Sequence, residues 1–130
     1  MTLATAIQFR QINLPTGVRL HYAERGPQNG QPFILLHGYS DPWFSFSRIL
    51  NLIPPEYRLI VPDQRGHGDS EHSIGGDTPE QFAADAIALF EALAIPAAVV
   101  IGHSLGSFVG QHMAALAPQC VGRLVGWEEQ

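Results

Sequence analysis

The sequence predicts an α/β fold, in which a mostly parallel sheet begins with an antiparallel pair of strands and carries helices on both faces. Short continuous apolar runs, typical of strands buried on both faces, alternate with segments whose apolar residues recur at helical spacing. Three loops that contain glycine directly follow such runs. The first segment of the chain alternates instead, as the strands of an antiparallel pair do. All three observations predict the same fold class.

The antiparallel pair is expected at residues 4–13 and 18–24, on either side of a turn at Pro15, Thr16 and Gly17. Buried strands are predicted at residues 33–36, 57–61, 97–101 and 121–127. Between them, helices are predicted at residues 44–53, 79–95 and 105–117, where prolines mark the ends. The alternation of strand and helix predicts a parallel sheet.

The second of these helices has a strong start signal. Thr78 is suited to the N-cap, Pro79 to the first turn, and Gln81 to a capping box. Apolar residues then follow on one helical stripe from Phe82 to Leu93. This helix is therefore expected to pack on the sheet through that stripe.

Composition limits the classes of protein to consider. The chain has 130 residues, of which 45% are hydrophobic and 15% charged, with a net charge of −5. This is the size of a single domain, and too apolar for a disordered chain. The seven basic residues are scattered arginines, so nucleic acid is not an expected partner. With one cysteine, no apolar run long enough to span a membrane and no signal-peptide pattern, we expect a cytoplasmic chain without a membrane partner.

The sharpest chemical signal is the sequence GHSLG at residues 102–106, between a predicted strand and a predicted helix. It matches G-x-S-x-G, in which a serine lies on a sharp and strained turn. Gly102 and Gly106 remove side chains that would collide there. The hydroxyl of Ser104 then projects above the sheet, where the N–H of Leu105, at a helix N-terminus, can stabilise an oxyanion.

The two other glycine loops are expected to lie beside this turn, because the carboxyl ends of parallel strands share one edge of the sheet. In HGYSDPW, residues 37–43, the N–H of Tyr39 is the candidate second oxyanion donor, whereas His37 and Trp43 are expected to shape the loop. The stretch DQRGHGDS, residues 63–70, matches no metal-ligand spacing, and no helix follows it at once to bind phosphate. We interpret it as a structural loop.

The stretches HGYSDPW, DQRGHGDS and GHSLGS, in this order and spacing, resemble the N-terminal half of an enzyme with the α/β-hydrolase fold. The resemblance covers the chain through the strand after the serine turn, so residues 1–130 are expected to form one partial domain. It implies Ser104 as the catalytic nucleophile and the N–H groups of Tyr39 and Leu105 as the oxyanion hole. It also implies hydrolysis of an ester or similar acyl bond through an acyl-enzyme, without cofactor or metal. Relatives with an Asp nucleophile are dehalogenases and epoxide hydrolases, and Ser104 disfavours both.

The family's catalytic triad runs in the order Ser, Asp or Glu, then His. After Ser104 the sequence contains only the acids Glu128 and Glu129 and the single histidine His112. His112 lies eight residues into the next helix, about 12 Å along its axis, and is not expected to reach the hydroxyl. The triad acid and base are therefore missing, and the sequence is interpreted as a truncated hydrolase fold. Serine needs an adjacent base, so this chain alone is expected to be an inactive or very weak hydrolase.

Two upstream histidines, His67 and His72, are possible substitutes for the base. His67 and His72 follow a neighbouring strand, whereas His103 precedes Ser104 and is expected to face away from it. The substrate expected from the aromatic residues near Tyr39 is a small hydrophobic ester.

The sequence also bears on two other classes of protein. The alternative to an enzyme is a non-catalytic fragment, or a binding or interaction module that retains the hydrolase fold. A nucleotide-binding domain is excluded, because no G-x-G-x-x-G follows the first parallel strand. The strand at residues 121–127 is predicted to leave an unprotected sheet edge, so self-association, or a second chain that supplies the missing half, is expected.

Overall fold

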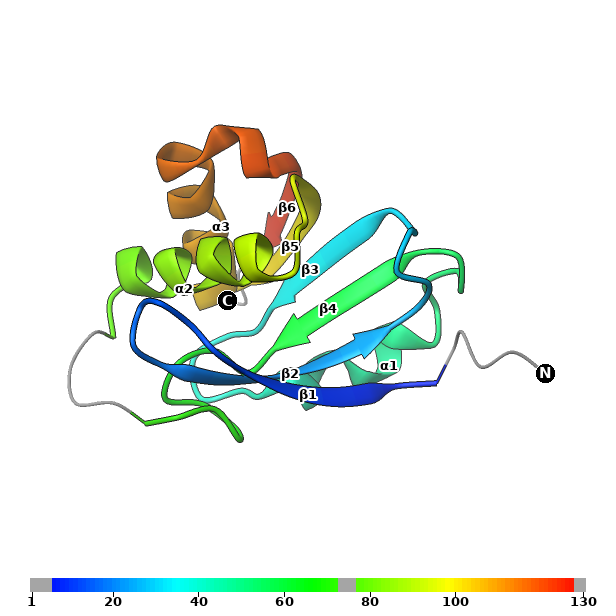
Figure 1. Cartoon of the computed structure of the whole chain (residues 1–130), viewed down its shortest axis with the longest axis horizontal. Helices are drawn as coiled ribbons and strands as arrows, with labels where there is room; N and C mark the ends of the chain where they lie inside the picture. Colours follow the sequence, from blue (N-terminus) through cyan, green and yellow to red (C-terminus); the bar gives the residue numbers. More distant parts are fainter. Residues whose placement is uncertain (1–5, 73–76, 128–130) are drawn as a thin grey trace.

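A computed structural model describes residues 6–72 and 77–127 of the chain. They form one six-stranded sheet in the order β1-β2-β4-β3-β5-β6 (Figure 1). The strands are β1 (Gln8–Asn13), β2 (Arg19–Arg25), β3 (Pro32–Leu36), β4 (Arg58–Pro62), β5 (Ala98–His103) and β6 (Val121–Trp127). β4, β3, β5 and β6 run parallel, whereas β2 pairs antiparallel with both β1 and β4. The predicted fold class is therefore confirmed.

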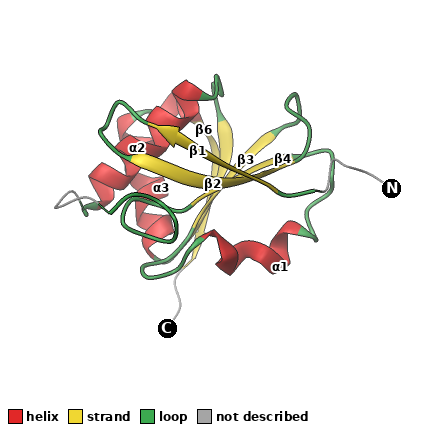
Figure 2. Ribbon diagram, turned by 60° about the horizontal axis from the view of Figure 1, so that its bottom comes forward, coloured by secondary structure: helices red, strands yellow, loops and turns green. Residues whose placement is uncertain are grey.

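Helices cover both faces of the sheet. α2 (Pro79–Ala92) and α3 (Leu105–Leu116) pack together on one face, and α1 (Ser47–Leu50) lies on the other (Figure 2). α2 begins as its sequence predicts, because the Thr78 hydroxyl accepts a hydrogen bond from the Gln81 N–H at 3.2 Å. This cap satisfies one of the donors that a helix N-terminus leaves without a partner.

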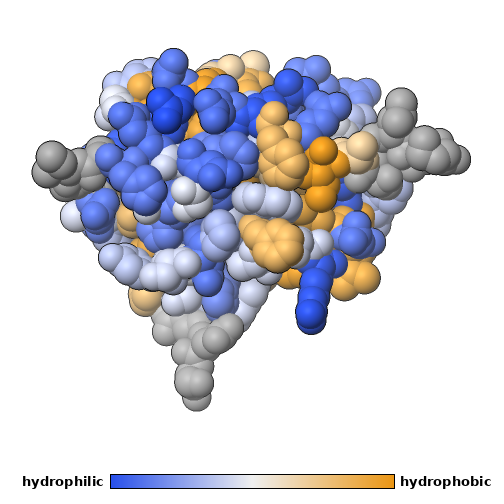
Figure 3. All heavy atoms as spheres, turned by 90° about the horizontal axis from the view of Figure 1, so that it is seen from below, coloured by the Kyte–Doolittle hydropathy of each residue, from blue (hydrophilic) through white to orange (hydrophobic). Residues whose placement is uncertain are grey.

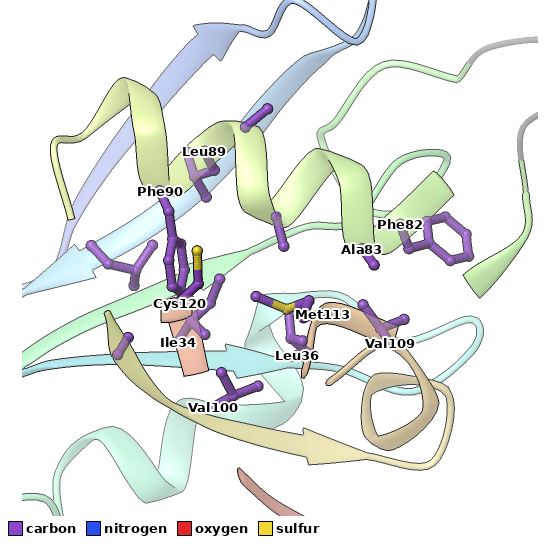
Figure 4. Close-up of a cluster of buried hydrophobic side chains, with 14 of the residues drawn as sticks. Ile34, Leu36, Phe82, Ala83, Leu89, Phe90, Val100, Val109, Met113 and Cys120 are labelled. Carbon is purple, nitrogen blue, oxygen red and sulfur yellow. The ribbon is translucent and has the colours of Figure 1, made fainter. Parts of the chain in front are cut away.

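The main core lies between the sheet and the pair α2 and α3. Apolar side chains from β3 and β5 meet those of the two helices, as the labelled residues of Figure 4 show. Ile34, Leu89, Val100 and Met113 are each fully buried there. A second, smaller cluster beneath α1 buries side chains of β3 and β4 on the opposite face. Both faces of the central strands are therefore buried, which explains their continuous apolar runs.

Two predicted elements differ from the structure. The helix predicted at residues 44–53 is a 3₁₀ turn, η2 (Trp43–Phe46), followed by the single α-helical turn of α1. The carbonyl groups of Leu50, Ile53 and Pro54 accept hydrogen bonds from the Arg25 guanidinium instead of from a continuing helix. The strand at residues 121–127 forms as predicted, but it is not a core strand, because most of its residues are exposed.

The face seen from below the view of Figure 1 is largely hydrophilic, with one group of hydrophobic side chains gathered on it (Figure 3). None of the helices in the described residues is long and apolar enough to cross a bilayer. The first strand was predicted from residue 4; β1 begins at Gln8, and residues 4 and 5 lie outside the described part of the chain.

Candidate active site

Ser104 lies at the junction between β5 and α3. Its backbone has φ 56° and ψ −112°, a conformation that residues with a side chain rarely adopt. The Ser104 N–H donates to the carbonyl of Trp127 on β6, at 2.7 Å. The Ser104 carbonyl in turn accepts from the Ser107 N–H at 2.9 Å and so begins α3. These contacts hold a backbone conformation that would otherwise cost about 1–3 kcal/mol.

The glycines on either side of Ser104 are required by close backbone contacts. A Cβ atom on Gly102 would collide with the carbonyl of Gly106, and a Cβ on Gly106 would collide with the carbonyl of Leu36 at the end of β3. The obstacles are main-chain atoms, which cannot rotate away as a flexible side chain can. The turn can therefore form in this place only with glycine at both positions.

The loop after β3 lies directly against this turn. A Cβ atom built on Gly38 would lie 3.4 Å from the Cβ of Ser104 and 3.3 Å from Nδ1 of His103. The structure thus brings the loop that contains Gly38 beside the serine. Within the described residues, neither the Tyr39 N–H nor the Leu105 N–H donates a hydrogen bond. Both groups are available for an oxyanion, and their role as the oxyanion hole remains a prediction.

His37 anchors the base of the same loop. Its ring is completely buried, and Nε2 accepts a hydrogen bond from the Gln64 N–H at 2.8 Å. Nδ1 therefore carries the proton and donates to the Gly38 carbonyl at 2.8 Å. Burial lowers the pKa of His37 to about 4, so the ring is neutral at neutral pH. This histidine shapes the loop, as the sequence predicted.

The stretch at residues 63–70 is a structural loop, also as predicted. The buried Asp63 carboxylate accepts hydrogen bonds from the Trp43 N–H at 2.6 Å, the Asp69 N–H at 3.0 Å and the His21 ring at 2.9 Å. A Cβ on Gly68 would collide with this carboxylate. Asp63 thereby joins the loops that follow β3 and β4, at the carboxyl ends of these strands.

Sequence reasoning missed two partners in this region. Asp85, on α2, holds Arg65 by two hydrogen bonds of 2.9 Å, and both side chains are buried. The available signal was an acid within the apolar stripe of a helix, because a buried carboxylate requires a cation. His21, on β2, bonds Asp63 from a strand that sequence spacing alone does not place beside β4.

The upstream histidines His67, His72 and His103 lie in three different environments. Nδ1–H of His67 donates to the Arg65 carbonyl at 2.9 Å, and the ring of His67 lies 4.8 Å from that of His37. His103 packs against Trp127, with ring centroids 5.2 Å apart. His72 is exposed. Within the described chain, the hydroxyl of Ser104 makes no hydrogen bond to any of them.

His112 has a different role from that of a base. Its Nε2 lies 3.4 Å from a carboxylate oxygen of Glu80 on α2, so this ring joins the two helices on their outer side. Glu128 and Glu129, the acids that follow β6, lie outside the described residues. The described side chains therefore contain a serine turn and two candidate oxyanion donors, without a base on the hydroxyl.

The fold and the serine turn together are typical of one class of protein, in which a strained serine lies between a strand of a mostly parallel sheet and the helix that follows it. The family model for the alpha/beta hydrolase fold matches residues 31–127, and the chain belongs to that family.

Three similar proteins illustrate the range of relatives. The AB hydrolase superfamily protein YfhM of Bacillus subtilis is 34% identical over 112 residues, which is 84% of this chain and 39% of that protein. A non-heme chloroperoxidase of Streptomyces lividans is 36% identical over 118 residues, 88% of this chain and 42% of that protein. The solved structure of the epoxide hydrolase CorEH superposes with a TM-score of 0.87 at 32% identity, covering 92% of this chain and 41% of that one. The chain spans about two fifths of the length of its relatives.

Proposed function

We propose that these residues form the nucleophile half of a serine-type α/β-hydrolase active site, which acts on an ester or related acyl bond of a small hydrophobic molecule. The observation that carries the proposal is the position of Ser104, at positive φ between β5 and α3, with the Gly38 loop against it. This arrangement presents a hydroxyl at the N-terminus of a helix, beside two N–H groups without partners.

The proposed chemistry is a two-step transfer of an acyl group through Ser104. The Ser104 oxygen attacks the acyl carbon, the leaving alcohol departs, and water releases the acyl group from the serine in a second step. The N–H groups of Tyr39 and Leu105 stabilise the tetrahedral oxyanion in both steps. Removal of the hydroxyl proton requires a base, and no described histidine makes a hydrogen bond to the Ser104 hydroxyl. We therefore propose that these 130 residues by themselves hydrolyse esters very weakly.

Relatives include a protein named as an epoxide hydrolase and one named as a non-heme chloroperoxidase. An Asp nucleophile is what the family resemblance associates with epoxide opening, and this chain has Ser104 in that position. We therefore favour acyl transfer over epoxide opening. The exposed aromatic rings of Tyr39 and Phe44, near the turn, support a hydrophobic acyl or alcohol group.

The test is a burst assay with p-nitrophenyl acetate, comparing the chain with a Ser104→Ala variant and with Ser45→Ala as the matched control. We expect no stoichiometric burst from any of the three. Added imidazole should then act as an external base and produce acetylation of the Ser104 peptide, detected by mass, in the chain and in the Ser45→Ala control alone.

The outcomes separate the parts of the proposal. A burst without imidazole, lost in Ser104→Ala, would show that a base is already in place and would contradict the expected weakness. Equal behaviour of all three proteins with imidazole would remove Ser104 as the nucleophile, and would favour a non-catalytic fold. The oxyanion hole and binding alone are expected to leave a rate only ~10³–10⁴ above that of water.

A further inference from the structure

A pocket of about 440 Å³ lies at the amino end of the parallel strands, the opposite end from Ser104. It is formed over β1, β2 and β4, beyond the last turn of α2. Its lining includes Arg10, Tyr22, Glu24, Arg58 and Leu93. Nothing in the proposed hydrolase site uses these residues.

Strand register explains why these polar side chains meet. Arg10 pairs with Tyr22 across β1 and β2, and Glu24 follows Tyr22 on the same face two residues later. Glu24 pairs in turn with Ile60 of β4, so Arg58, two residues before it, shares that face as well. The side chains of three strands are thus directed to one side of the sheet.

Glu24 fixes two guanidinium groups side by side. One carboxylate oxygen accepts from Nε of Arg10 and the other from Nε of Arg58, each at 3.0 Å. Both oxygens are occupied by Nε atoms, so the terminal amino groups point elsewhere. One of Arg10 bonds the Gln8 side chain, and one of Arg58 has a weak contact of 3.5 Å with the Gln28 carbonyl. The remaining amino groups have no partner within the described residues.

Tyr22 adds a donor of a different kind. The residue is 3% exposed and lines the pocket, and its hydroxyl makes no hydrogen bond within the part of the chain described. Burial and the nearby Glu24 raise the pKa of Tyr22, so the hydroxyl keeps its proton at neutral pH. The oxygen of this hydroxyl is accessible from the pocket, and a bound acceptor would give it a hydrogen-bond partner.

The local charge favours an anion. Arg10 and Arg58 against Glu24 give this face a formal charge of +1, in a chain whose net charge is −5. Arg25 is not counted, because its guanidinium is bonded to carbonyls beneath α1. In the last turn of α2, the carbonyls of Leu89, Phe90 and Glu91 already accept N–H groups. Terminal amino groups of two arginines and one hydroxyl, from three strands, suit the three acceptor oxygens of a phosphate group.

We propose that this pocket, lined by Arg10, Tyr22 and Arg58, is a binding site for the phosphate group of a small molecule. The side chains of Ala6 and Leu93 provide an apolar wall against which the organic part of a phosphate monoester packs. The proposal is independent of the hydrolase chemistry, because the pocket and Ser104 lie at opposite ends of the strands.

The experiment titrates the full chain with inorganic phosphate and with phenyl phosphate, at constant ionic strength set by chloride, and follows binding by calorimetry. Tyr22→Phe removes only the hydroxyl, and Arg10→Gln removes a half-exposed charge. Arg123→Gln, an exposed arginine on β6, is the matched control for the loss of charge. We expect saturable binding that weakens roughly tenfold in Tyr22→Phe and in Arg10→Gln and is unchanged in Arg123→Gln.

Two results would support the proposal and identify the source of the phosphate. Tighter binding of phenyl phosphate would indicate an organic monoester, whereas equal affinities would indicate free phosphate. The proposal would be overturned by a lack of saturable binding to either probe, by an equal loss in Arg123→Gln, or by benzoate binding as tightly as phenyl phosphate. Circular dichroism of each variant excludes loss of the fold as the cause.

Discussion

The backbone conformation of Ser104 depends on residues other than the serine itself. Gly102 and Gly106 leave room for the turn, and the carbonyl of Leu36, on the neighbouring strand, fills the space that a side chain at Gly106 would need. The serine hydroxyl contributes nothing to this packing, because it makes no hydrogen bond within the described chain. The neighbouring residues therefore fix the backbone conformation of Ser104, and the hydroxyl that would react takes no part in fixing it.

We expect Gly106→Ala to destabilise the fold by about 2–3 kcal/mol, because the new methyl group collides with a main-chain oxygen that cannot move aside. Gly122→Ala is the matched control. Its Cβ would lie 3.6 Å from the Ala98 carbonyl, an ordinary contact, and alanine restricts the unfolded chain. Urea unfolding of both variants gives the comparison. Equal stabilities would contradict the proposed packing of the turn.

His37 makes stability depend on pH. Its pKa is about 4 in the folded chain and close to 6.5 when the chain unfolds, so protons bind the unfolded state more tightly. The stability that the neutral ring contributes is complete above about pH 6.5 and is lost as the pH falls toward 4, by about 3 kcal/mol in total. Below pH 4 this histidine adds no further loss.

The measurement is the free energy of unfolding at neutral pH and near pH 4, in the chain, in His37→Gln and in His72→Gln. We expect the pH-dependent loss to shrink in His37→Gln and to be unchanged in the variant of the exposed His72. Carboxylates titrate in the same range, so the difference between the variants is the quantity to compare. An NMR titration of the His37 ring reports the same pKa directly, and a value near 6.5 would contradict the prediction.

Among the elements, α2 is tied to the loop after β4 by the buried ion pair of Asp85 and Arg65. Asp85 binds Arg65 through two oxygens, and the loop that Arg65 belongs to also positions Asp63 and His67. The helix therefore supports the loop geometry beside the candidate site, in addition to covering the sheet. Its second polar link, Glu80 to His112, is largely exposed and is expected to contribute little.

Asp85→Asn should cost up to about 3 kcal/mol, because it removes the carboxylate that makes two hydrogen bonds to the buried Arg65 guanidinium. Glu80→Gln, on the same helix, should cost less than about 1 kcal/mol. Thermal or urea unfolding distinguishes the two variants. If both had the same small effect, the buried pair would not be what fixes α2 to the loop.

The sequence predicted the neighbourhood of Ser104 well, because its signals are local. A buried run, two glycines and a helix start fall within a few residues, and Ala98–His103 and Leu105–Leu116 lie within two residues of the expected bounds. The end of α1 was not predictable in the same way. The carbonyls of Leu50 and Ile53 at this end accept hydrogen bonds from Arg25, a residue far away in the sequence.

The strand order and the pocket lined by Arg10, Tyr22 and Arg58 could not be predicted, for the same reason. Periodicity identifies strands but does not say that β2 lies beside β4 and not beside β3. The meeting of Arg10, Glu24 and Arg58 follows only from that order, because the three residues belong to three strands. Contacts made across the sheet must be seen in the structure before such a site can be recognised.

For the molecule as a whole, the notable feature is the exposed edge of the sheet at β6. β6 pairs with β5 alone among the described strands, and it exposes Val125 and Trp127, 46% and 41% exposed. Phe108 and Leu116 of α3, the helix packed on β6, are exposed as well. An edge strand with unpaired N–H and carbonyl groups beside exposed apolar side chains invites pairing with another chain.

We expect the 130-residue chain to self-associate through β6, seen as a sedimentation coefficient that rises with concentration. Val125→Lys should shift the chain toward monomer, because a charge on an edge strand opposes pairing with a second strand. Leu52→Lys, which places the same charge at a residue 80% exposed after α1, is the control and should leave association unchanged. A monomer at every concentration for the unmodified chain would contradict this expectation.

The strand order also determines when each part of the fold can form. Asn13 and Arg19 pair across a short turn, so the hairpin of β1 and β2 closes a small loop. Phe33 of β3 must instead pair with Val99 of β5, and about half of the chain lies between them. Closing a long loop is entropically costly and slows folding. Ser104, at the end of β5, therefore reaches its strained conformation late in folding, after the hairpin has formed and once the longest connection of the sheet has closed.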